Sequence, residues 1–297
     1  MNRRLMSTCI GLALLVAFLC SPAAAKSPKQ HKNMPVYYLS LGTSLAAGVQ
    51  ADEDGFSVVT DVSYPGLLAE IIAEDVRKLR HVNLGCPGED SDTFIDGGIC
   101  DYRHGSQLDQ AVHFLHAHGK FTGLITIDLG ANDVLSCVQD TLIDLECISE
   151  TIARLAGNLS YVLATLREAA GPEVPIIGMN YYNPLLASWF QDPDTAALTA
   201  ALQAQINTAL ESVYAQFNIP VADVAGAFGS GDLQTDENNN GIPDSVETLC
   251  AWTWMCDRHN IHPNDIGYQV IAEEFAAVLP PLVPEKKVHH DCKPQHK

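Results

Sequence analysis

The sequence predicts an α/β fold in which a parallel sheet lies between layers of helices, and three observations lead to it. Apolar, β-branched runs alternate with segments of helical periodicity through the whole chain. Alternation of this kind is typical of a parallel sheet covered by helices. The length of 297 residues suits one large α/β domain. No repeat, low-complexity linker or interior boundary divides the chain, so we predict one domain over residues 36–282.

Five short runs have the composition of buried strands. The first run is followed directly by Gly42 and the third by Gly130, so both end at residues that favour turns. In chain order the predicted strands are Val36–Leu41, His81–Leu84, Leu124–Leu129, Val174–Met179 and Pro220–Asp223.

Five longer segments have the spacing of amphipathic helices. In the fourth segment Leu198, Leu202 and Ile206 recur at helical spacing, and Asp194 precedes the segment as a candidate N-cap. The predicted helices are Tyr64–Arg80, Gln107–His118, Cys147–Ala170, Thr195–Phe217 and Asp265–Val278.

The two ends of the chain are predicted to lie outside the fold. Residues 1–25 have a basic start, an apolar core over Ile10–Leu19 and a small-residue cleavage site, which is the pattern of a signal peptide. The apolar core is too short for a comfortable membrane span. Lipid attachment at Cys20 is the alternative, but Leu19 is bulky where that signal needs a small residue. We therefore expect a secreted or periplasmic protein without a stable membrane anchor, an N-terminal extension over 26–35 and a disordered tail over 283–297.

The charge limits the class of partner. The formal net charge is −19, and removal of the signal peptide takes away two arginines and no acids, which leaves −21. Such an excess of carboxylates argues against nucleic acid and anionic membrane surfaces as partners. We expect a monomer.

The cysteines predict local cross-links. Of the nine cysteines, Cys9 and Cys20 lie in the signal peptide and Cys292 lies in the tail. In an exported protein, cysteines that are close in sequence are expected to form disulfides. The six remaining cysteines form the close pairs Cys86/Cys100, Cys137/Cys147 and Cys250/Cys256.

Ser44 is the first candidate for chemistry. The first predicted strand ends in Gly42-Thr43-Ser44, which places a serine hydroxyl at the carboxyl end of a strand, where open α/β sheets form their sites. The surroundings of Ser44 do not match the Gly-x-Ser-x-Gly elbow, and the serine lies on the first strand. An α/β-hydrolase fold is therefore disfavoured.

Three later segments offer the other groups that ester cleavage requires. Asn132 follows the third strand and offers a side-chain amide, and Gly85 follows the second strand and offers a backbone N–H. Both suit a developing oxyanion. His262, held before Pro263 in the loop that enters the last helix, is the candidate general base. Each residue alone is more often structural, but their combination with Ser44 favours a catalytic site.

The pattern resembles the SGNH, or GDSL, hydrolase family. The resemblance rests on four blocks in order: Gly42-Thr43-Ser44-Leu45, Asn83-Leu84-Gly85, Gly130-Ala131-Asn132-Asp133 and His262-Pro263-Asn264. It implies a flavodoxin-like three-layer α/β/α sandwich with a five-stranded parallel sheet. It also implies a carboxylic-ester hydrolase that works through an acyl-enzyme on a small-molecule, lipid or acylated-sugar ester. Ser44 would be the nucleophile and His262 the base, with the Ser44 N–H, Gly85 and Asn132 as oxyanion donors.

Two positions depart from the family pattern. Thr43 stands where the family has Asp before the serine, and His259 stands three residues before the histidine, where the family has its triad acid. Neither His259 nor Asn260 can be an anionic partner for the imidazole. Two alternatives stay open, namely Asp257 or a main-chain carbonyl. We expect a Ser-His dyad, with Asp257 as the candidate third member of a triad.

A second motif, over residues 236–247, predicts a structural calcium ion. The segment fits the Asp-x-Asn-x-Asn-Gly-x₅-Glu loop, in which Gly241 permits the sharp turn. Gly229-Ser230-Gly231 is a poor incoming helix, so this is a calcium loop without a full EF-hand, and an Asn-rich surface loop is the alternative. The predicted ligands are Asp236, Asn238, Asn240, Ile242 through its carbonyl, Asp244 and Glu247.

The predicted chemistry needs no cofactor, and two other functions remain open. A phospholipase or lipase of the same family differs only in substrate. A non-catalytic, calcium-stabilised binding module on the same scaffold is favoured by the missing triad acid. His113, His116 and His118 are more consistent with a solvated helix face than with a metal cluster, because His118 does not align with the other two.

Overall fold

The structure is a computed structural model that describes residues 35–139 and 142–282. The predicted signal peptide with Cys9 and Cys20, most of the N-terminal extension, and the tail with Cys292 lie outside the described residues.

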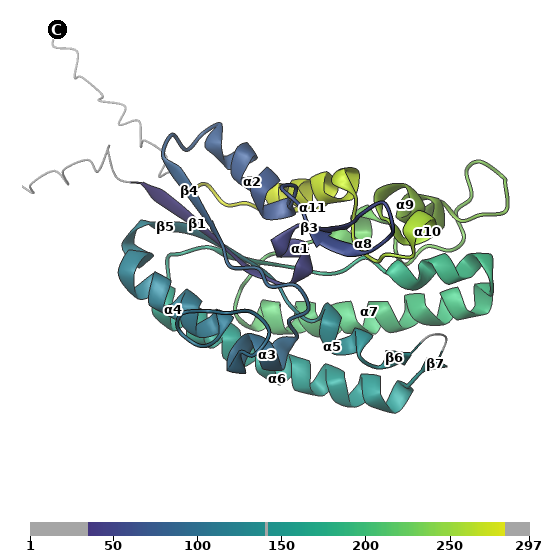
Figure 1. The fold of residues 1–297 in the computed structure, drawn as a ribbon, viewed down its shortest axis with the longest axis horizontal. Coiled ribbons are helices and arrows are strands. Elements are labelled where there is room, and N and C mark those ends of the chain that lie inside the picture. The colour runs from purple at the N-terminus through teal and green to yellow at the C-terminus, as the bar shows by residue number, and fades with distance from the viewer. Residues whose placement is uncertain (1–34, 140–141, 283–297) are drawn as a thin grey trace, which may run out of the picture. The chain divides into compact units, whose positions relative to one another are not determined.

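The core is a five-stranded parallel sheet, so the predicted fold class is confirmed (Figure 1). The spatial order β4-β1-β5-β8-β9 places the first strand between the second and third strands of the prediction. Every neighbouring pair in this sheet is parallel. The strands are β1 Val36–Gly42, β4 Leu79–Asn83, β5 Thr122–Asp128, β8 Ile176–Met179 and β9 Val221–Ala222.

Helices cover both faces of this sheet. Figure 1 shows α4, α6 and α7 below the sheet and α2 and α11 above it. The neighbours Tyr38 and Leu39 of β1, and Leu124 and Ile125 of β5, are completely buried. Because neighbours in a strand point to opposite faces, both faces of these strands are covered. The long helices are α2 Tyr64–Ala73, α4 Gln107–His118, α6 Leu145–Ala170, α7 Pro193–Gln216 and α11 Asp265–Ala277.

Three helix boundaries differ from the prediction by two residues or more. The helix predicted to begin at Cys147 begins at Leu145, because the Asp144 side chain caps it by accepting the Cys147 N–H. The predicted helix Tyr64–Arg80 ends at Ala73, and the chain turns so that Leu79 and Arg80 already pair with β1. The helix predicted to begin at Thr195 begins at Pro193, because the Asp192 side chain, not that of Asp194, caps it by accepting the Asp194 N–H.

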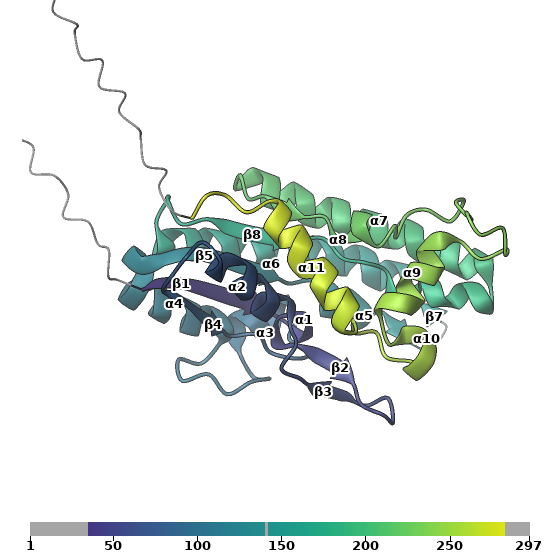
Figure 2. The same ribbon diagram turned by 90° about the horizontal axis from the view of Figure 1, so that it is seen from above.

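Short elements lie mostly beyond the carboxyl ends of the strands (Figure 2). They include the hairpin β2–β3 and the short hairpin β6–β7, and none of them was predicted. They are α1 Ser44–Ala47, β2 Val49–Ala51, β3 Ser57–Val59, α3 Ser91–Asp96, η1 Gly119–Phe121, α5 Ala131–Leu135, β6 Val138–Gln139, β7 Leu142–Ile143, η2 Pro184–Phe190, α8 Val224–Ala227, α9 Asp244–Trp252 and α10 Met255–Arg258.

The three predicted disulfides are all present. Cys86–Cys100 closes the loop after β4, Cys137–Cys147 joins the end of α5 to the start of α6, and Cys250–Cys256 joins α9 to α10. Over the described part of the chain, no helix is long and apolar enough to cross a membrane.

Candidate active site

Ser44 lies at the point where β1 passes into the short helix α1. The turn before it requires glycine, because Gly42 has φ +138° and a Cβ there would lie 2.3 Å from an Asp128 carboxylate oxygen. Gln107 holds the same residue from both sides, since its Oε1 accepts the Gly42 N–H at 2.7 Å and its Nε2 donates to the Gly42 carbonyl at 2.9 Å. The half-buried Ser44 is thus presented on a fixed turn at the carboxyl end of the central strand.

Thr43 is the partner of a buried carboxyl group. Its N–H and its hydroxyl both donate to Asp128 Oδ1, at 2.9 and 2.7 Å, and the Tyr64 hydroxyl donates to Oδ2 at 2.9 Å. Burial raises the pKa of Asp128 to about 7. A second carboxylate at position 43 would meet Asp128, which explains why threonine stands there.

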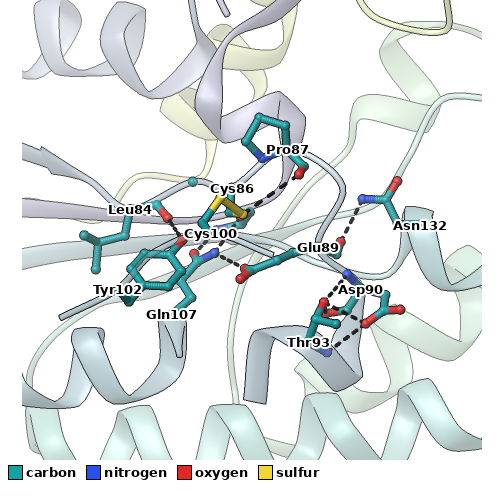
Figure 3. Close-up of a disulfide and its surroundings, with 12 residues drawn as sticks. Leu84, Cys86, Pro87, Glu89, Asp90, Thr93, Cys100, Tyr102, Gln107 and Asn132 are labelled. Atoms are coloured by element: carbon teal, nitrogen blue, oxygen red, sulfur yellow. Dashed lines mark hydrogen bonds between the residues drawn. A yellow bond between two sulfur atoms is a disulfide. The ribbon is translucent and has the colours of Figure 1, made fainter. Parts of the chain in front are cut away.

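Asn132 lies in the first turn of α5, after the end of β5. Its Nδ2 donates to the Glu89 carbonyl at 2.7 Å (Figure 3), which fixes the orientation of the amide and leaves its second N–H hydrogen available. Gly130, at the N-cap of α5, has φ +129°, and a Cβ there would lie 2.9 Å from Leu155. The adjacent Asp133 accepts from Ser91 at the start of α3, so the two short helices are tied together.

The buried carboxyl of Glu89 supports the same loop. Its Oε2 accepts a hydrogen bond from Gln107 Nε2, the group that also holds Gly42 (Figure 3). Its Oε1 is buried without a partner among the described residues, and burial raises the pKa of Glu89 to about 7. The Cys86–Cys100 disulfide closes the loop on the other side.

Gly85 does not reach the site through its N–H. That N–H donates to the Asn83 side-chain oxygen at 2.9 Å, while the Asn83 amide donates to the Ala46 carbonyl at 2.7 Å. A Cβ on Gly85 would lie 2.7 Å from Ala46, so the glycine permits close packing on α1. The prediction that Gly85 is an oxyanion donor is therefore not supported by its contacts.

Gly88, three residues further on, lies where Gly85 was expected. It lines a cavity together with Ser44, Asn132 and His262. Its φ is +86°, and within the described ranges its N–H has no hydrogen-bond acceptor. Sequence reasoning missed Gly88 because a glycine followed by an acidic residue in a loop carries no sign of which N–H faces the serine.

His262 is oriented by an uncharged side chain. Its Nδ1 lies 2.7 Å from Asn260 Oδ1, and the Asn260 amide nitrogen donates to the Gly55 carbonyl at 3.1 Å and to the Ser57 hydroxyl at 3.0 Å. These two bonds assign the oxygen of the amide to the imidazole, so Nδ1 carries the proton and Nε2 is the basic nitrogen. Burial lowers the pKa of His262 to about 4.

Asp257 is not brought to His262. It lies exposed on α10, and the position it would occupy beside Nδ1 is taken by the buried Asn260. The other predicted partner of the imidazole, a main-chain carbonyl, is not used either, because the Asn260 side-chain oxygen lies beside Nδ1. A carboxylate was expected because it stabilises the imidazolium, but a neutral amide oxygen is sufficient to hold the ring.

The loop that carries His262 is tied to two neighbours. Its backbone pairs with the end of α9, since the Trp254 N–H donates to the His262 carbonyl at 3.0 Å and the Asn264 N–H to the Trp252 carbonyl at 3.0 Å. Arg258 donates to the carbonyls of Ala51 and Asp52, which fastens the hairpin β2–β3 to α10. The Cys250–Cys256 disulfide lies in this same segment.

The four segments converge at one edge of the sheet. Ser44, Asn132 and His262 line two cavities in common, one of them shared with Gly88 and the other bounded mainly by apolar side chains. A hydroxyl, an imidazole, an amide and a backbone N–H therefore lie around one space large enough for a substrate carbonyl. That arrangement is the one acyl transfer requires.

The predicted calcium ligands gather at the start of α9. Asn238 Nδ2 and Asn240 Nδ2 donate to the two carboxylate oxygens of Glu247, at 2.9 and 2.8 Å. Asp236 accepts the N–H groups of Asn240 and Gly241, and Gly241 has φ +84°. Asp244 accepts the Glu237 N–H at 3.2 Å.

The loop therefore has the composition of the predicted site and the turn at Gly241, and the calcium ion itself stays a prediction. A half-turn of the two asparagine amides would direct their oxygens to the point where their nitrogens now meet Glu247. Over the described ranges, no group of three or more His, Cys, Asp or Glu side chains is placed to hold a metal, so the three acidic ligands Asp236, Asp244 and Glu247 are not gathered around one point in this structure. His113 instead stacks on His104, with ring centroids 3.7 Å apart.

Comparison with known proteins gives a family match over most of the chain. The model of the GDSL-like Lipase/Acylhydrolase family matches residues 40–270, which includes every segment of the site described above. The search of curated proteins found no match.

Solved structures share the fold at low sequence identity. A lipase from a goat rumen metagenome has 18% identity and a TM-score of 0.53, over 82% of this chain and 96% of that chain. A GDSL-like lipase, described as putative, from Parabacteroides merdae has 12% identity and a TM-score of 0.55, over 82% and 94%. An acetylxylan esterase from Geobacillus stearothermophilus has 16% identity and a TM-score of 0.52, over 82% and 94%. At such low sequence identity, the similarity to these structures concerns the fold alone.

Proposed function

This chain belongs to the GDSL-like Lipase/Acylhydrolase family, and from that premise we propose that it hydrolyses carboxylic esters through an acyl-enzyme formed on Ser44. The observation that carries the proposal is the shared cavity lined by Ser44, Gly88, Asn132 and His262. Membership of the family makes the chain a serine esterase or lipase. The roles of the individual residues are our assignment.

The proposed steps use the groups that line the shared cavity. His262 Nε2 takes the proton of the Ser44 hydroxyl as the oxygen attacks the ester carbonyl, and then returns it to the leaving alcohol. Water repeats the sequence on the acyl-enzyme. Asn260 keeps the ring in the correct tautomer, with its proton on Nδ1. Because this partner is neutral, we propose a Ser-His dyad rather than a triad with Asp257.

Three donors suit the negative charge that develops on the carbonyl oxygen. They are the Ser44 N–H, the Gly88 N–H and the second N–H hydrogen of the Asn132 amide. The first two are backbone groups on fixed turns, and the third is held by its bond to the Glu89 carbonyl.

Substitution of Asn132 tests the assignment. We expect Asn132→Ala to lower kcat for a short p-nitrophenyl ester about 10²- to 10³-fold, the usual effect of removing one oxyanion donor. Gln216→Ala also removes a side-chain amide, lies exposed at the end of α7, and is the matched control that should keep the wild-type rate. A wild-type kcat in a folded Asn132→Ala variant would contradict the assignment.

We also propose that the calcium loop binds a structural ion through Asp236, Asn238, Asn240, Ile242, Asp244 and Glu247. Support comes from the ligand spacing and from the convergence of the asparagine side chains on Glu247. The loop leads into α9, and α9 pairs with the His262 loop, so the ion would order the segment that carries the base. It takes no part in the chemical steps.

Secretion remains part of the proposal. Three disulfides in the structure are compatible with an oxidising compartment. The signal peptide itself lies outside the described residues.

A further inference from the structure

We infer that the apolar cavity beside Ser44 is an acyl pocket for an alkyl chain longer than acetyl, so that esters of longer fatty acids are better substrates than acetate esters. The inference rests on the proposed function for the position of the ester carbonyl. It goes beyond it by assigning the class of the acyl group.

The walls of this cavity are built by several elements and are mainly aliphatic. At one end lie Ser44, Asn132 and His262. The remaining walls come from α5, the β6–β7 hairpin, α6, η2 and α7, with Leu135, Val138, Ile143, Leu185, Leu202 and Ile206 among them. Burial of an alkyl chain against such side chains is favourable in proportion to the apolar area removed from water.

The buried polar groups in the walls are already engaged with one another. The Asn183 amide donates to the Thr199 hydroxyl at 3.1 Å, and the Asn183 side-chain oxygen accepts the Leu185 N–H at 3.0 Å. The Tyr182 hydroxyl donates to the Ile261 carbonyl at 2.6 Å. Among the buried wall residues within the described ranges, only the Tyr181 hydroxyl lacks a partner. An alkyl chain has no bonds to water to lose, so its burial between these walls leaves no polar group of its own without a partner, whereas an acetyl group would leave most of the walls uncovered.

The cavity has a continuation that suits a longer chain. A second cavity shares four lining residues with it and extends along η2 to α10, past Phe190 and Met255. The shared residues are Val138, Ile143, Leu185 and Thr199.

The other side of Ser44 suits the alcohol. The cavity that contains Gly88 is also lined by Ser57 and Val59, and both of these residues are exposed. An alcohol can leave and water can enter on this open side, while the acyl chain stays in the apolar pocket. The ester therefore has one orientation that matches both cavities.

A series of p-nitrophenyl esters from acetyl to dodecanoyl, used below their micelle concentrations, tests the chain-length preference. Each methylene that enters the pocket should raise kcat/KM up to about fourfold, which corresponds to about 0.8 kcal/mol per buried CH₂. We expect the octanoyl ester to exceed the acetyl ester by at least tenfold. An octanoyl ester no better than the acetyl ester would overturn the inference.

Variants on one helix locate the effect. Leu202 faces the cavity, and Leu198, one turn earlier on α7, is exposed and lies outside its walls. We expect Leu202→Trp to lower kcat/KM for the octanoyl ester at least tenfold while the acetyl ester changes less than twofold. Leu198→Trp should leave both unchanged. Leu185→Trp, on η2, gives a second narrowing variant should Leu202→Trp not fold. Equal octanoyl rates in the narrowing variants and the control would contradict the assignment.

Measurement of octanoate binding distinguishes an error in the assigned acyl pocket from an error in the proposed function. Octanoate is titrated calorimetrically into Ser44→Ala and into Ser44→Ala/Leu202→Trp. Binding that the second substitution weakens at least tenfold supports the pocket, even if the wild type cleaves no ester, in which case only the proposed function fails. Hydrolysis of acetyl esters without octanoate binding would overturn the pocket and leave the proposed function standing.

Discussion

Among single residues, Asn260 has the largest consequence for the chemistry. Its amide oxygen holds His262 Nδ1, and its amide nitrogen is bound to the hairpin β2–β3, so the ring is oriented without any negative charge beside it. An anionic partner would favour the imidazolium and raise the pKa of His262. With a neutral partner, burial is the dominant influence and lowers that pKa to about 4.

The pH dependence of kcat/KM follows from this. A base must be neutral to act, so activity should be constant from about pH 8 to pH 5 and should fall to half near pH 4, where His262 becomes protonated. In Asn260→Asp the new carboxylate would stabilise the imidazolium, so the acid limb should move to higher pH. Asn218→Asp, exposed beyond the end of α7, is the control and should keep the wild-type acid limb. An acid limb that is the same in wild type and Asn260→Asp would contradict the role of Asn260.

Residue patterns identified only part of this site. Ser44, Asn132 and His262 could be found because each follows a strand or precedes a helix in a distinctive block. Asn260 was set aside for its lack of charge, and Gly85 was chosen over Gly88. The direction of the Asn260 side chain is set by contacts with Gly55 and Ser57, which are distant in sequence. The direction of the Gly85 N–H is set by its bond to Asn83, which depends on the local turn.

At the scale of elements, the long helices were predictable and the short ones were not. Helices such as α4 and α6 carry enough periodic apolar residues for their spacing to be clear. The hairpins β2–β3 and β6–β7 have three and two residues per strand, too few for an alternating pattern. Yet these short elements hold Asn260 and form one wall of the acyl pocket.

The loop over residues 236–247 gives a prediction at the same scale. An ion that binds only the folded protein stabilises it by about 2.7 kcal/mol at one hundred times its Kd. We therefore expect calcium to raise Tm by about 5 to 10 °C over the value in EDTA, as measured by differential scanning calorimetry.

Two glutamates in this loop provide a matched pair of variants. Glu247→Gln removes the carboxylate on which Asn238 and Asn240 converge, so it should abolish the calcium-dependent rise in Tm. Glu237→Gln lies at a position that supplies no ligand side chain and should keep the rise. Identical melting curves with calcium and with EDTA in the wild type would remove the ion from the account.

For the whole molecule, the parallel sheet brings the site together. In the order β4-β1-β5, the loops after three adjacent strands open at one edge, and they carry Gly88, Ser44 and Asn132. The His262 loop reaches the same edge through its pairing with α9 and its contact with the hairpin β2–β3. Alternation of strands and helices was sufficient to predict this architecture, because parallel strands present all their carboxyl ends on one side.

Covalent labelling of Ser44 is the measurement that tests the convergence of these segments most directly. A fluorophosphonate reacts with a serine only where a base and oxyanion donors activate it, so intact-mass spectrometry of the folded protein should show one adduct, mapped by digestion to Ser44. His262→Ala should label far more slowly and Ser44→Ala not at all. A folded wild-type protein that stays unmodified, or that carries the adduct on another residue, would contradict the account.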